Sequence, residues 1–367
     1  MKPIERFIIG KKKMMITEKN TYRWLCSCLV VGGLLLLSGC SGGSSGDDVP
    51  PSEQAYLQLG AVTRTAGAFE INDPATKIKL FLATQTSLLQ PVEGSTYSYS
   101  TDHWSSQTPF LVKENTQYYL YGYMPASLSA TKSAPEGDYS KGINLTLSNL
   151  PAITTDDICV LVGVQRVGAN STSSQSVTEG QYGFITGIKG QNYLNLLMAH
   201  LYAKMKVSFK IDPAYAELRS IHLKNITLSS KYADGASVAV SLRSGQGIGS
   251  PTFQSVNEEQ VHSVILLDTK KILNKSFVST PLTLDIPAYC RPMGLEGTYH
   301  LTLTTTYDVY DTKNQNLGER TSENKIDFNM AEVRPGQEKD IVLTVKPTYL
   351  YILSEYDADN PTITLGE

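Results

Sequence analysis

Hydrophobic and polar residues alternate along most of this chain. Alternation over four to eight residues puts successive side chains on opposite faces, so it predicts β-strands with one buried face. Val, Ile, Thr and Tyr dominate these runs, and clusters of Gly, Ser, Asn, Asp and Pro separate them. The clearest runs are Tyr56–Leu59, Lys77–Leu82, Gln117–Tyr123, Gly142–Leu147, Ile221–Leu228, Leu282–Pro287, Tyr299–Tyr307 and Lys339–Val345. The pattern predicts an all-β protein made of β-sandwiches.

One segment interrupts this alternating pattern and indicates a boundary between two domains. Residues Asn192–Ile211 fit a helix at first, but strict alternation follows from Met205. We interpret the segment as a strand that opens a second domain, after a polar, Gly-rich stretch. The predicted boundary near residue 190 gives two tandem sandwich domains, 54–190 and 191–367.

Glu258–Phe277 is the best remaining candidate for a helix. It lies inside the second predicted domain, where every other extended run favours a strand.

The N-terminal residues predict export. Seven basic and two acidic residues lie within the first 39, and the apolar stretch Trp24–Leu37 is too short for a comfortable transmembrane helix of about 20 residues. Leu37-Ser38-Gly39-Cys40 follows, as in a lipoprotein signal peptide. We expect residues 1–39 to be removed between Gly39 and Cys40, and Cys40 to carry lipid.

Two details of this N-terminal region follow from the same residues. Residues 40–53 are rich in Gly and Ser, which predicts a flexible tether. Met1, Met14 and Met15 each remain possible starts of translation.

Charge limits the class of partner. The chain has 367 residues and a formal net charge of −3, and the first 39 residues contribute +5 of it. The remaining 328 residues are therefore acidic, at about −8. Since phosphate binding requires clustered Lys and Arg, we expect no nucleic-acid partner.

Residues capable of chemistry are few and scattered. Cys159 and Cys290 lie in apolar, strand-like runs, which favours buried free thiols, although a disulfide between them stays open. His200 has no Cys, His or carboxylate at metal-ligand spacing, so we interpret it as a packing histidine. Trp104, beside His103, is a candidate platform for stacking a sugar with the chain's tyrosines, although ordinary core and edge aromatic residues are the default interpretation. No motif indicates a cofactor, a metal site or an enzyme.

The C-terminal tail is prone to form strands after an apparently complete domain. Residues Tyr349–Ser354 and Thr362–Leu365 are the apolar parts of this tail. Exposed strand-forming edges are normally avoided unless something pairs with them, so the tail predicts a pairing partner.

Several motifs together resemble one family. They are the Leu-Ser-Gly-Cys40 sequence with its tether, Thr63-Arg64-Thr65 closing the first strand, the aromatic strand end Tyr121–Pro125, and His200–Val207 with its His-x-x-Ala-Lys start. In this order the chain resembles the fimbrillins of Bacteroidetes-type bacteria, which build surface pili from lipoprotein precursors. The resemblance implies transthyretin-like β-sandwich domains, other pilus subunits as partners, and an outer-membrane location at the cell surface through acylated Cys40. A host or bacterial surface ligand is possible.

The resemblance also implies roles for particular segments. A protease would cut after Arg64, leaving Thr65 as the new N-terminus and releasing the strand Tyr56–Val62. A donor strand from another subunit would fill the groove. Its best match here is the C-terminal tail, with apolar positions Tyr349, Tyr351, Leu353, Ile363 and Leu365. Strand addition satisfies backbone groups and buries alternate side chains.

Three alternatives stay open. Arg64 also fits an exposed arginine at a strand end. The chain lacks the tryptophan that some relatives have near the C-terminus, so its place as stalk, tip or anchor is undetermined. The alternative function is a monomeric glycan-binding lipoprotein at the cell surface.

Overall fold

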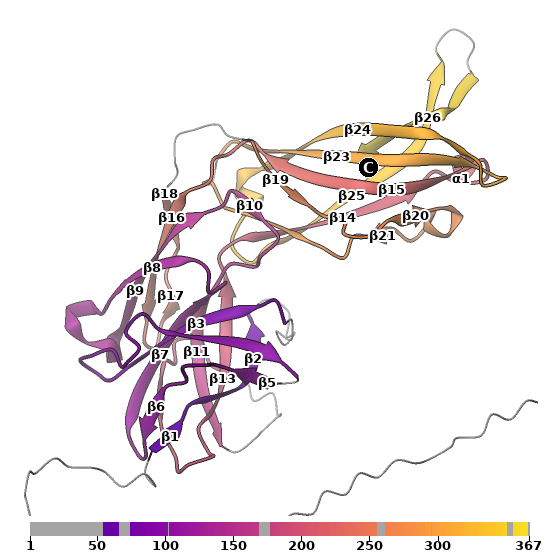
Figure 1. Ribbon diagram of the computed structural model, residues 1–367. Helices are drawn as coiled ribbons and strands as arrows, with labels where there is room; N and C mark the ends of the chain where they lie inside the picture. The colour runs from indigo at the N-terminus through magenta and orange to yellow at the C-terminus, as the bar shows by residue number, and fades with distance from the viewer. Residues whose placement is uncertain are drawn as a thin grey trace, which may run out of the picture. The chain divides into compact units, whose positions relative to one another are not determined.

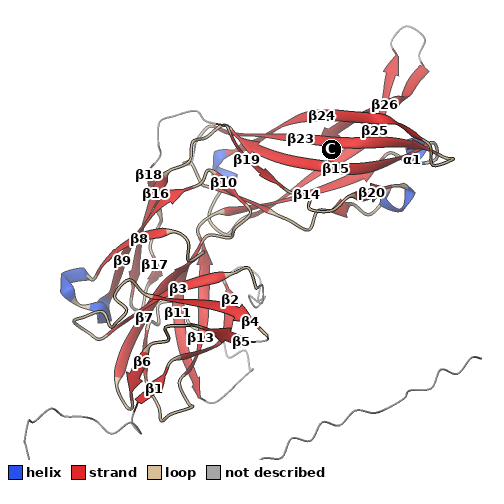
Figure 2. Ribbon diagram, viewed as in Figure 1, coloured by secondary structure: helices blue, strands red, loops and turns tan. Residues whose placement is uncertain are grey.

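The computed structural model describes residues 54–65, 74–101, 103–168, 177–254, 261–294, 296–350 and 355–365. Strands account for nearly all of the regular structure, so the predicted all-β class is confirmed (Figure 2). Within these residues the only α-helix is the four-residue α1 (Pro213–Ala216). The 3₁₀ turns are η2 (Pro135–Gly137), η3 (Tyr139–Lys141), η4 (Lys275–Phe277) and η5 (Met330–Glu332).

The first sheet has the strand order β2-β13-β11-β7-β3-β4-β5 (Figure 1). Its strands are β2 (Gln58–Arg64), β13 (Tyr193–His200), β11 (Cys159–Gly168), β7 (Gln117–Met124), β3 (Lys77–Ala83), β4 (Ser95–Ser100) and β5 (His103–Ser105), with β12 (Gly183–Ile185) paired to β7. In β3, both Leu80 and the adjacent Phe81 are buried, and they belong to two different cores. Burial on both faces explains the unbroken apolar residues Leu80–Ala83 at the end of β3.

One face of this sheet packs against a second sheet of order β17-β16-β9-β8. Its strands are β17 (Gly247–Ile248), β16 (Ala236–Arg243), β9 (Gly142–Leu150) and β8 (Ser129–Ser133), with β18 (Thr252–Gln254) paired to β16. The other face covers a core that also holds residues of the antiparallel pair β1 (Gln54–Tyr56) and β6 (Leu111–Lys113).

Two further sheets form a sandwich around one core, and all their strands except one come from residues after 202. The first contains β10 (Ile153–Thr154), β22 (Ala288–Cys290), β14 (Ala203–Ile211), β25 (Glu338–Leu350) and β26 (Glu355–Leu365), with β21 (Leu282–Thr283) on β14. The second contains β19 (His262–Ile265), β15 (Arg219–Ser230), β23 (Thr298–Asp311) and β24 (Asn316–Asn329), with β20 (Lys271–Leu273) on β15.

Residues Asn192–Ile211 form two strands, and the prediction of a single strand is wrong. The chain leaves the first sheet at the end of β13, passes Leu201 and Tyr202, and enters another sheet as β14. Met205, Val207, Phe209 and Ile211 are at most 1% exposed, as their alternation predicted. The domain boundary near residue 190 stays a proposal. Two strands that follow residue 190, β13 and β16, pair with strands that precede it, β11 and β9.

The predicted helix at Glu258–Phe277 is also wrong for its described part. Residues from His262 onward form strands β19 and β20 and the turn η4. Both strands pair with β15, so tertiary pairing with a long neighbouring strand overrides a weak helical pattern.

Candidate functional site

Strand β2 lies at one edge of the first sheet, where it runs parallel to β13. Leu57, Leu59 and Val62 are at most 4% exposed and lie in the core beneath this sheet. The hydroxyl of Tyr97 on β4 donates a hydrogen bond of 3.3 Å to the carbonyl of Leu57. Each buried side chain of this size contributes about 1.5–3 kcal/mol, so the three together stabilise the closed sheet by roughly 5–9 kcal/mol.

The ladder between β2 and β13 is irregular at its centre. The register shifts between Leu194 and Leu196, where the side chain of buried Asn195 replaces a backbone acceptor. Its Oδ1 accepts a hydrogen bond of 2.9 Å from the Ala61 amide. A Cβ at Gly60 would lie 2.5 Å from the same oxygen, so only glycine fits without displacement. At the register shift, the backbone of β2 is therefore held by the Asn195 side chain in place of a ladder hydrogen bond.

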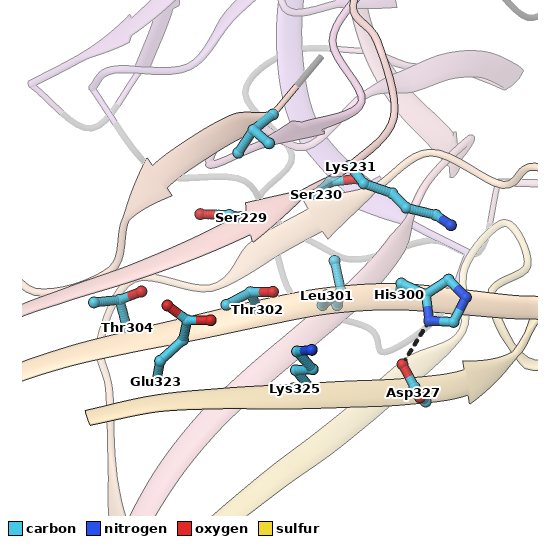
Figure 3. Close-up of a pocket in the computed structure, with 11 residues that line it drawn as sticks. Ser229, Ser230, Lys231, His300, Leu301, Thr302, Thr304, Glu323, Lys325 and Asp327 are labelled. Carbon is cyan, nitrogen blue, oxygen red and sulfur yellow. Dashed lines mark hydrogen bonds and ion pairs between the residues drawn. The ribbon is translucent and has the colours of Figure 1, made fainter. Parts of the chain in front are cut away.

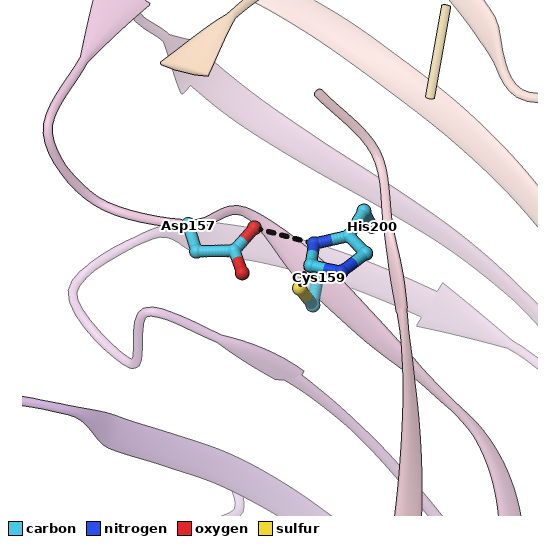
Figure 4. A group of neighbouring side chains, drawn as sticks. All are labelled: Asp157, Cys159 and His200. Carbon is cyan, nitrogen blue, oxygen red and sulfur yellow. Dashed lines mark hydrogen bonds and ion pairs between the residues drawn. The ribbon is translucent and has the colours of Figure 1, made fainter. Parts of the chain in front are cut away.

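Four side chains meet at the C-terminal end of β2: Arg64, Asp157, Cys159 and His200. Figure 4 shows three of them, Asp157, Cys159 and His200. Asp157 is the centre of this group, which we call the Arg64 cluster. Its Oδ2 lies 2.8 Å from Nε of Arg64, and its Oδ1 lies 2.8 Å from Nδ1 of His200. Cys159 Sγ lies 3.5 Å from the same Nδ1. The exposed fractions are 4% for the Asp157 side chain, 11% for His200 and 25% for Arg64.

Strand directions explain why residues so far apart in the sequence meet. Because β2 is parallel to β13, its last residue, Arg64, pairs with Met198 near the end of β13. Because β11 is antiparallel to β13, its first residue, Cys159, pairs with His200. Asp157 lies two residues earlier, at the same end of the sheet. The interpretation of His200 as a packing histidine therefore missed its neighbours Asp157 and Cys159, since spacing along the chain does not reveal cross-strand pairs.

Electrostatics in the Arg64 cluster centre on a buried carboxylate. Removing a charge from water costs several kcal/mol unless partners compensate, and Arg64 is the cation that faces Asp157 Oδ2. That oxygen accepts no hydrogen bond from the described residues, so the ion pair is its compensation. Burial raises the pKa of the Cys159 thiol well above its usual value, and the nearby charge of Asp157 adds to this rise. Cys159 is therefore neutral at neutral pH.

The two predicted buried thiols are both confirmed as free. Cys159 and Cys290 are each fully buried and form no disulfide. Burial raises the pKa of Cys290 to about 12.

The predicted donor segment closes on its own sheet. Strand β26 pairs with β25 in an antiparallel register that aligns Ile363 with Val345 and Leu365 with Leu343. Ile363 is 1% exposed and belongs to the core of the C-terminal sandwich, whereas Leu365 is 43% exposed. Tyr349, on β25, is the register partner of Tyr356 on β26. Tyr351 and Leu353 fall outside the described residues. A donor role would require β26 to leave β25.

The proposed sugar platform at Trp104 is wrong. Trp104 is 6% exposed, belongs to the core of the first sheet and packs edge-on against Tyr99 at 5.5 Å. Its neighbour His103 is exposed because successive strand residues face opposite sides.

A polar groove of about 660 Å³ crosses β15, β23 and β24 (Figure 3). His300 Nδ1 and Asp327 Oδ1 lie within hydrogen-bond distance, 2.7 Å, at one end. Lys231 and Lys325 line the same groove as Glu323 and Asp327. Because basic and acidic side chains are mixed, the groove favours neither anionic nor cationic ligands.

The predicted lipidation site, Cys40, and the cleavage position after Gly39 lie outside the described residues. No helix among the residues that the structure describes is long and apolar enough to cross a membrane.

The structure therefore defines an all-β chain of paired sheets with a core-filling edge strand near its N-terminus. No family model and no curated protein matches the chain. It is similar to a solved "fimbrial protein" from Bacteroides vulgatus, with 11% identity and a TM-score of 0.44, covering 84% of this chain and 98% of the other. A "putative cell adhesion protein" from Bacteroides fragilis is 12% identical, with a TM-score of 0.43, covering 85% and 94%. One with the same description from Bacteroides uniformis is 10% identical, with a TM-score of 0.40, covering 86% and 98%.

A "putative cell adhesion protein" from Bacteroides ovatus is a further similar structure with a description of this kind. With TM-scores below 0.5, these likenesses leave the function to be inferred from the chain's own residues.

Proposed function

We propose that this chain is a non-enzymatic, adhesive subunit of a surface pilus, exported as a lipoprotein and assembled by strand exchange after cleavage behind Arg64. The observation that carries the proposal is strand β2, an edge strand whose apolar side chains fill a core and whose last residue is Arg64. Such a strand is removable in one piece, because it has a neighbour on one side only.

The position of the proposed cut suits this role. Thr65 is exposed and follows directly on β2, and the next strand of the sheet, β3, begins at Lys77. A cut between Arg64 and Thr65 detaches β1 and β2 and leaves every other strand of the sheet continuous. Loss of Leu57, Leu59 and Val62 leaves an apolar groove beside β13.

A groove of this kind favours a replacement strand. Leaving it empty costs roughly 5–9 kcal/mol of burial, which is comparable to the total stability of a domain, 5–15 kcal/mol. An incoming strand with alternate apolar residues restores that burial and pairs with the exposed edge of β13. Since donor and groove lie on different surfaces, the contact is head-to-tail and builds a filament.

We assign the donor role to β26, which carries Ile363 and Leu365 on alternate positions. It is also an edge strand, with β25 as its one neighbour in its sheet. Lipid on Cys40 anchors the precursor at the outer membrane, and the release of the segment before Thr65 separates the subunit from this anchor.

The proposal is tested by an engineered, reducible disulfide that holds the donor strand β26 on β25. Thr344 and Thr364 are a cross-strand pair between β25 and β26, at a Cα separation of about 4.5–5.5 Å that suits a disulfide. In cells producing Thr344→Cys/Thr364→Cys, we expect the SDS-resistant ladder of unheated surface extracts to disappear under oxidising conditions. It should return when cells are grown with a reductant.

A matched pair controls for the added cysteines. Thr304→Cys/Glu323→Cys links β23 to β24, which have no proposed part in exchange. This variant should give the wild-type ladder in both conditions. If the Thr344→Cys/Thr364→Cys variant still gives the ladder under oxidising conditions, the assignment of β26 as donor is overturned.

A further inference from the structure

We propose that Asp157, Cys159 and His200 form a binding site for a thiophilic divalent cation of the zinc class, and that Arg64 keeps this site closed until it departs. The departure of Arg64 rests on the proposed function, whereas the site itself rests on the three side chains. In this proposal, the precursor binds no metal ion at the site, and the processed subunit, which has lost Arg64, binds one.

The donor set is one that zinc prefers. A thiol, an imidazole and a carboxylate present their ligand atoms within 4.8 Å of one another. Zinc takes sulfur at about 2.3 Å and nitrogen or oxygen at about 2.0–2.2 Å in tetrahedral sites, so neighbouring ligand atoms lie about 3.4–3.6 Å apart. Cys159 Sγ and His200 Nδ1 already lie 3.5 Å apart. His200 Nδ1 and Asp157 Oδ1, at 2.8 Å, need only a small separation.

A second, independent feature points to a cation at this position. The Asp157 side chain is 4% exposed, and its Oδ2 accepts no hydrogen bond from the described residues. The positive charge that faces it belongs to Arg64, whose Nε is 2.8 Å away but is not aligned as a hydrogen-bond donor. When Arg64 leaves, the buried carboxylate of Asp157 loses its guanidinium partner and keeps His200 and Cys159 as neighbours.

Arg64 and a metal ion exclude each other for electrostatic reasons. Both require the carboxylate of Asp157, and a guanidinium a few ångströms from a divalent cation is repelled by it. Arg64 is also the most exposed member of the cluster, so its removal opens the path from solvent to the three ligands. When the metal ion binds, the Cys159 thiol releases its proton to solvent. The three side chains fill three positions of a tetrahedral site, and water takes the fourth.

The metal would act where the proposed exchange takes place. Cys159 belongs to β11 and His200 to β13, so a bound ion ties together the two strands that remain at this edge when β2 is gone. This link would stiffen the edge of the open groove and preserve the register that the incoming strand requires.

The test is a cobalt titration of the full chain, because a Co²⁺–thiolate bond gives a near-ultraviolet charge-transfer band. In Arg64→Gln, which removes the guanidinium without cleavage, we expect the band to appear and Zn²⁺ to displace it. In the wild type we expect affinity weaker by about tenfold or more, or about 1.4 kcal/mol. Arg64→Met, which keeps most of the apolar stem, serves as a second variant if the Gln variant does not fold.

The other buried thiol provides the matched control. Arg64→Gln/Cys159→Ser should lose the band, whereas Arg64→Gln/Cys290→Ser should keep it, with folding checked by thermal unfolding. Absence of the band in both folded Arg64 variants, or equal Co²⁺ affinity in the wild type and Arg64→Gln, would overturn the proposal. Neither result depends on processing or on pilus ladders, so the metal site and the proposed function fail or stand separately.

Discussion

At the scale of single residues, the account depends on how Asp157 is compensated. The Asp157 side chain is 4% exposed, and Arg64 and His200 lie 2.8 Å from its two oxygens. The same ion pair holds the side chain of Arg64, beside the bond whose cleavage we propose. In the proposed function, Arg64 is therefore both the residue that a protease recognises and the partner of Asp157.

Replacing Asp157 should measure this double role. We expect Asp157→Asn to lower the free energy of unfolding by about 2–3 kcal/mol. This is less than the 3–5 kcal/mol typical of a fully buried pair, because Arg64 is a quarter exposed. Chemical denaturation of the precursor gives the value. Asp156→Asn, one residue earlier and exposed, is the matched control. If both substitutions cost the same, the ion pair contributes nothing.

Alkaline pH should reveal the buried thiol of Cys290. Its pKa is raised to about 12 by burial from an ordinary value of 9.0, so the folded state retains a proton that the unfolded state loses above pH 9. The stabilising contribution is complete below pH 9 and falls by up to about 1.4 kcal/mol per pH unit above it. We expect unfolding free energies measured from pH 7 to 11 to fall more steeply for the wild type than for Cys290→Ala. Parallel curves would refute the assignment of this slope to Cys290.

Among single residues, the sequence predicted the buried faces better than the Arg64 cluster. Met205 and Val207 are buried as their alternation required, because a period of two depends only on local backbone geometry. The meeting of His200 with Asp157 depends on how β11 pairs with β13, and no pattern along the chain encodes that register. Trp104 was misassigned because an aromatic residue fits both a core and a binding surface.

At the scale of elements, strand β2 combines strong burial with an interrupted ladder. Its apolar side chains are fixed in the core, but its centre depends on the hydrogen bond from Ala61 to the side chain of Asn195. A strand of this kind is stable until it is cut and separable afterwards. The sequence predicted this strand, and also β3, β7 and β9, because each alternates and is bounded by turn residues. It did not predict the break between β13 and β14, since alternation continues through a change of sheet.

A substitution at Gly60 should loosen β2 without touching its apolar side chains. A Cβ there lies 2.5 Å from Asn195 Oδ1, so Gly60→Ala displaces this acceptor from the Ala61 amide, at a cost of about 1–3 kcal/mol. We expect faster hydrogen exchange at the Ala61 amide and faster cutting after Arg64 by an arginine-specific protease. Gly249→Ala, whose Cβ meets the nearest atom at 3.4 Å, should leave both rates unchanged. Unaltered exchange in Gly60→Ala would mean that Asn195 does not hold the strand.

At the scale of the whole molecule, two edge strands have complementary properties. β2 fills a core that, in the proposed function, it vacates after cleavage, and β26 carries alternate apolar residues at the edge of another sheet. The sequence predicted the all-β class, because strand patterns recur along the chain. It did not predict that β26 folds back onto β25, because pairing partners are set by tertiary packing.

The most direct test of the account is the N-terminus of the protein recovered from the cell surface, determined by mass spectrometry. The account predicts a chain that begins at Thr65, with β1 and β2 removed and the groove beside β13 open to a donor strand. A surface protein that still begins at acylated Cys40 would contradict it, because β2 would then remain in its own core and leave no place for another subunit.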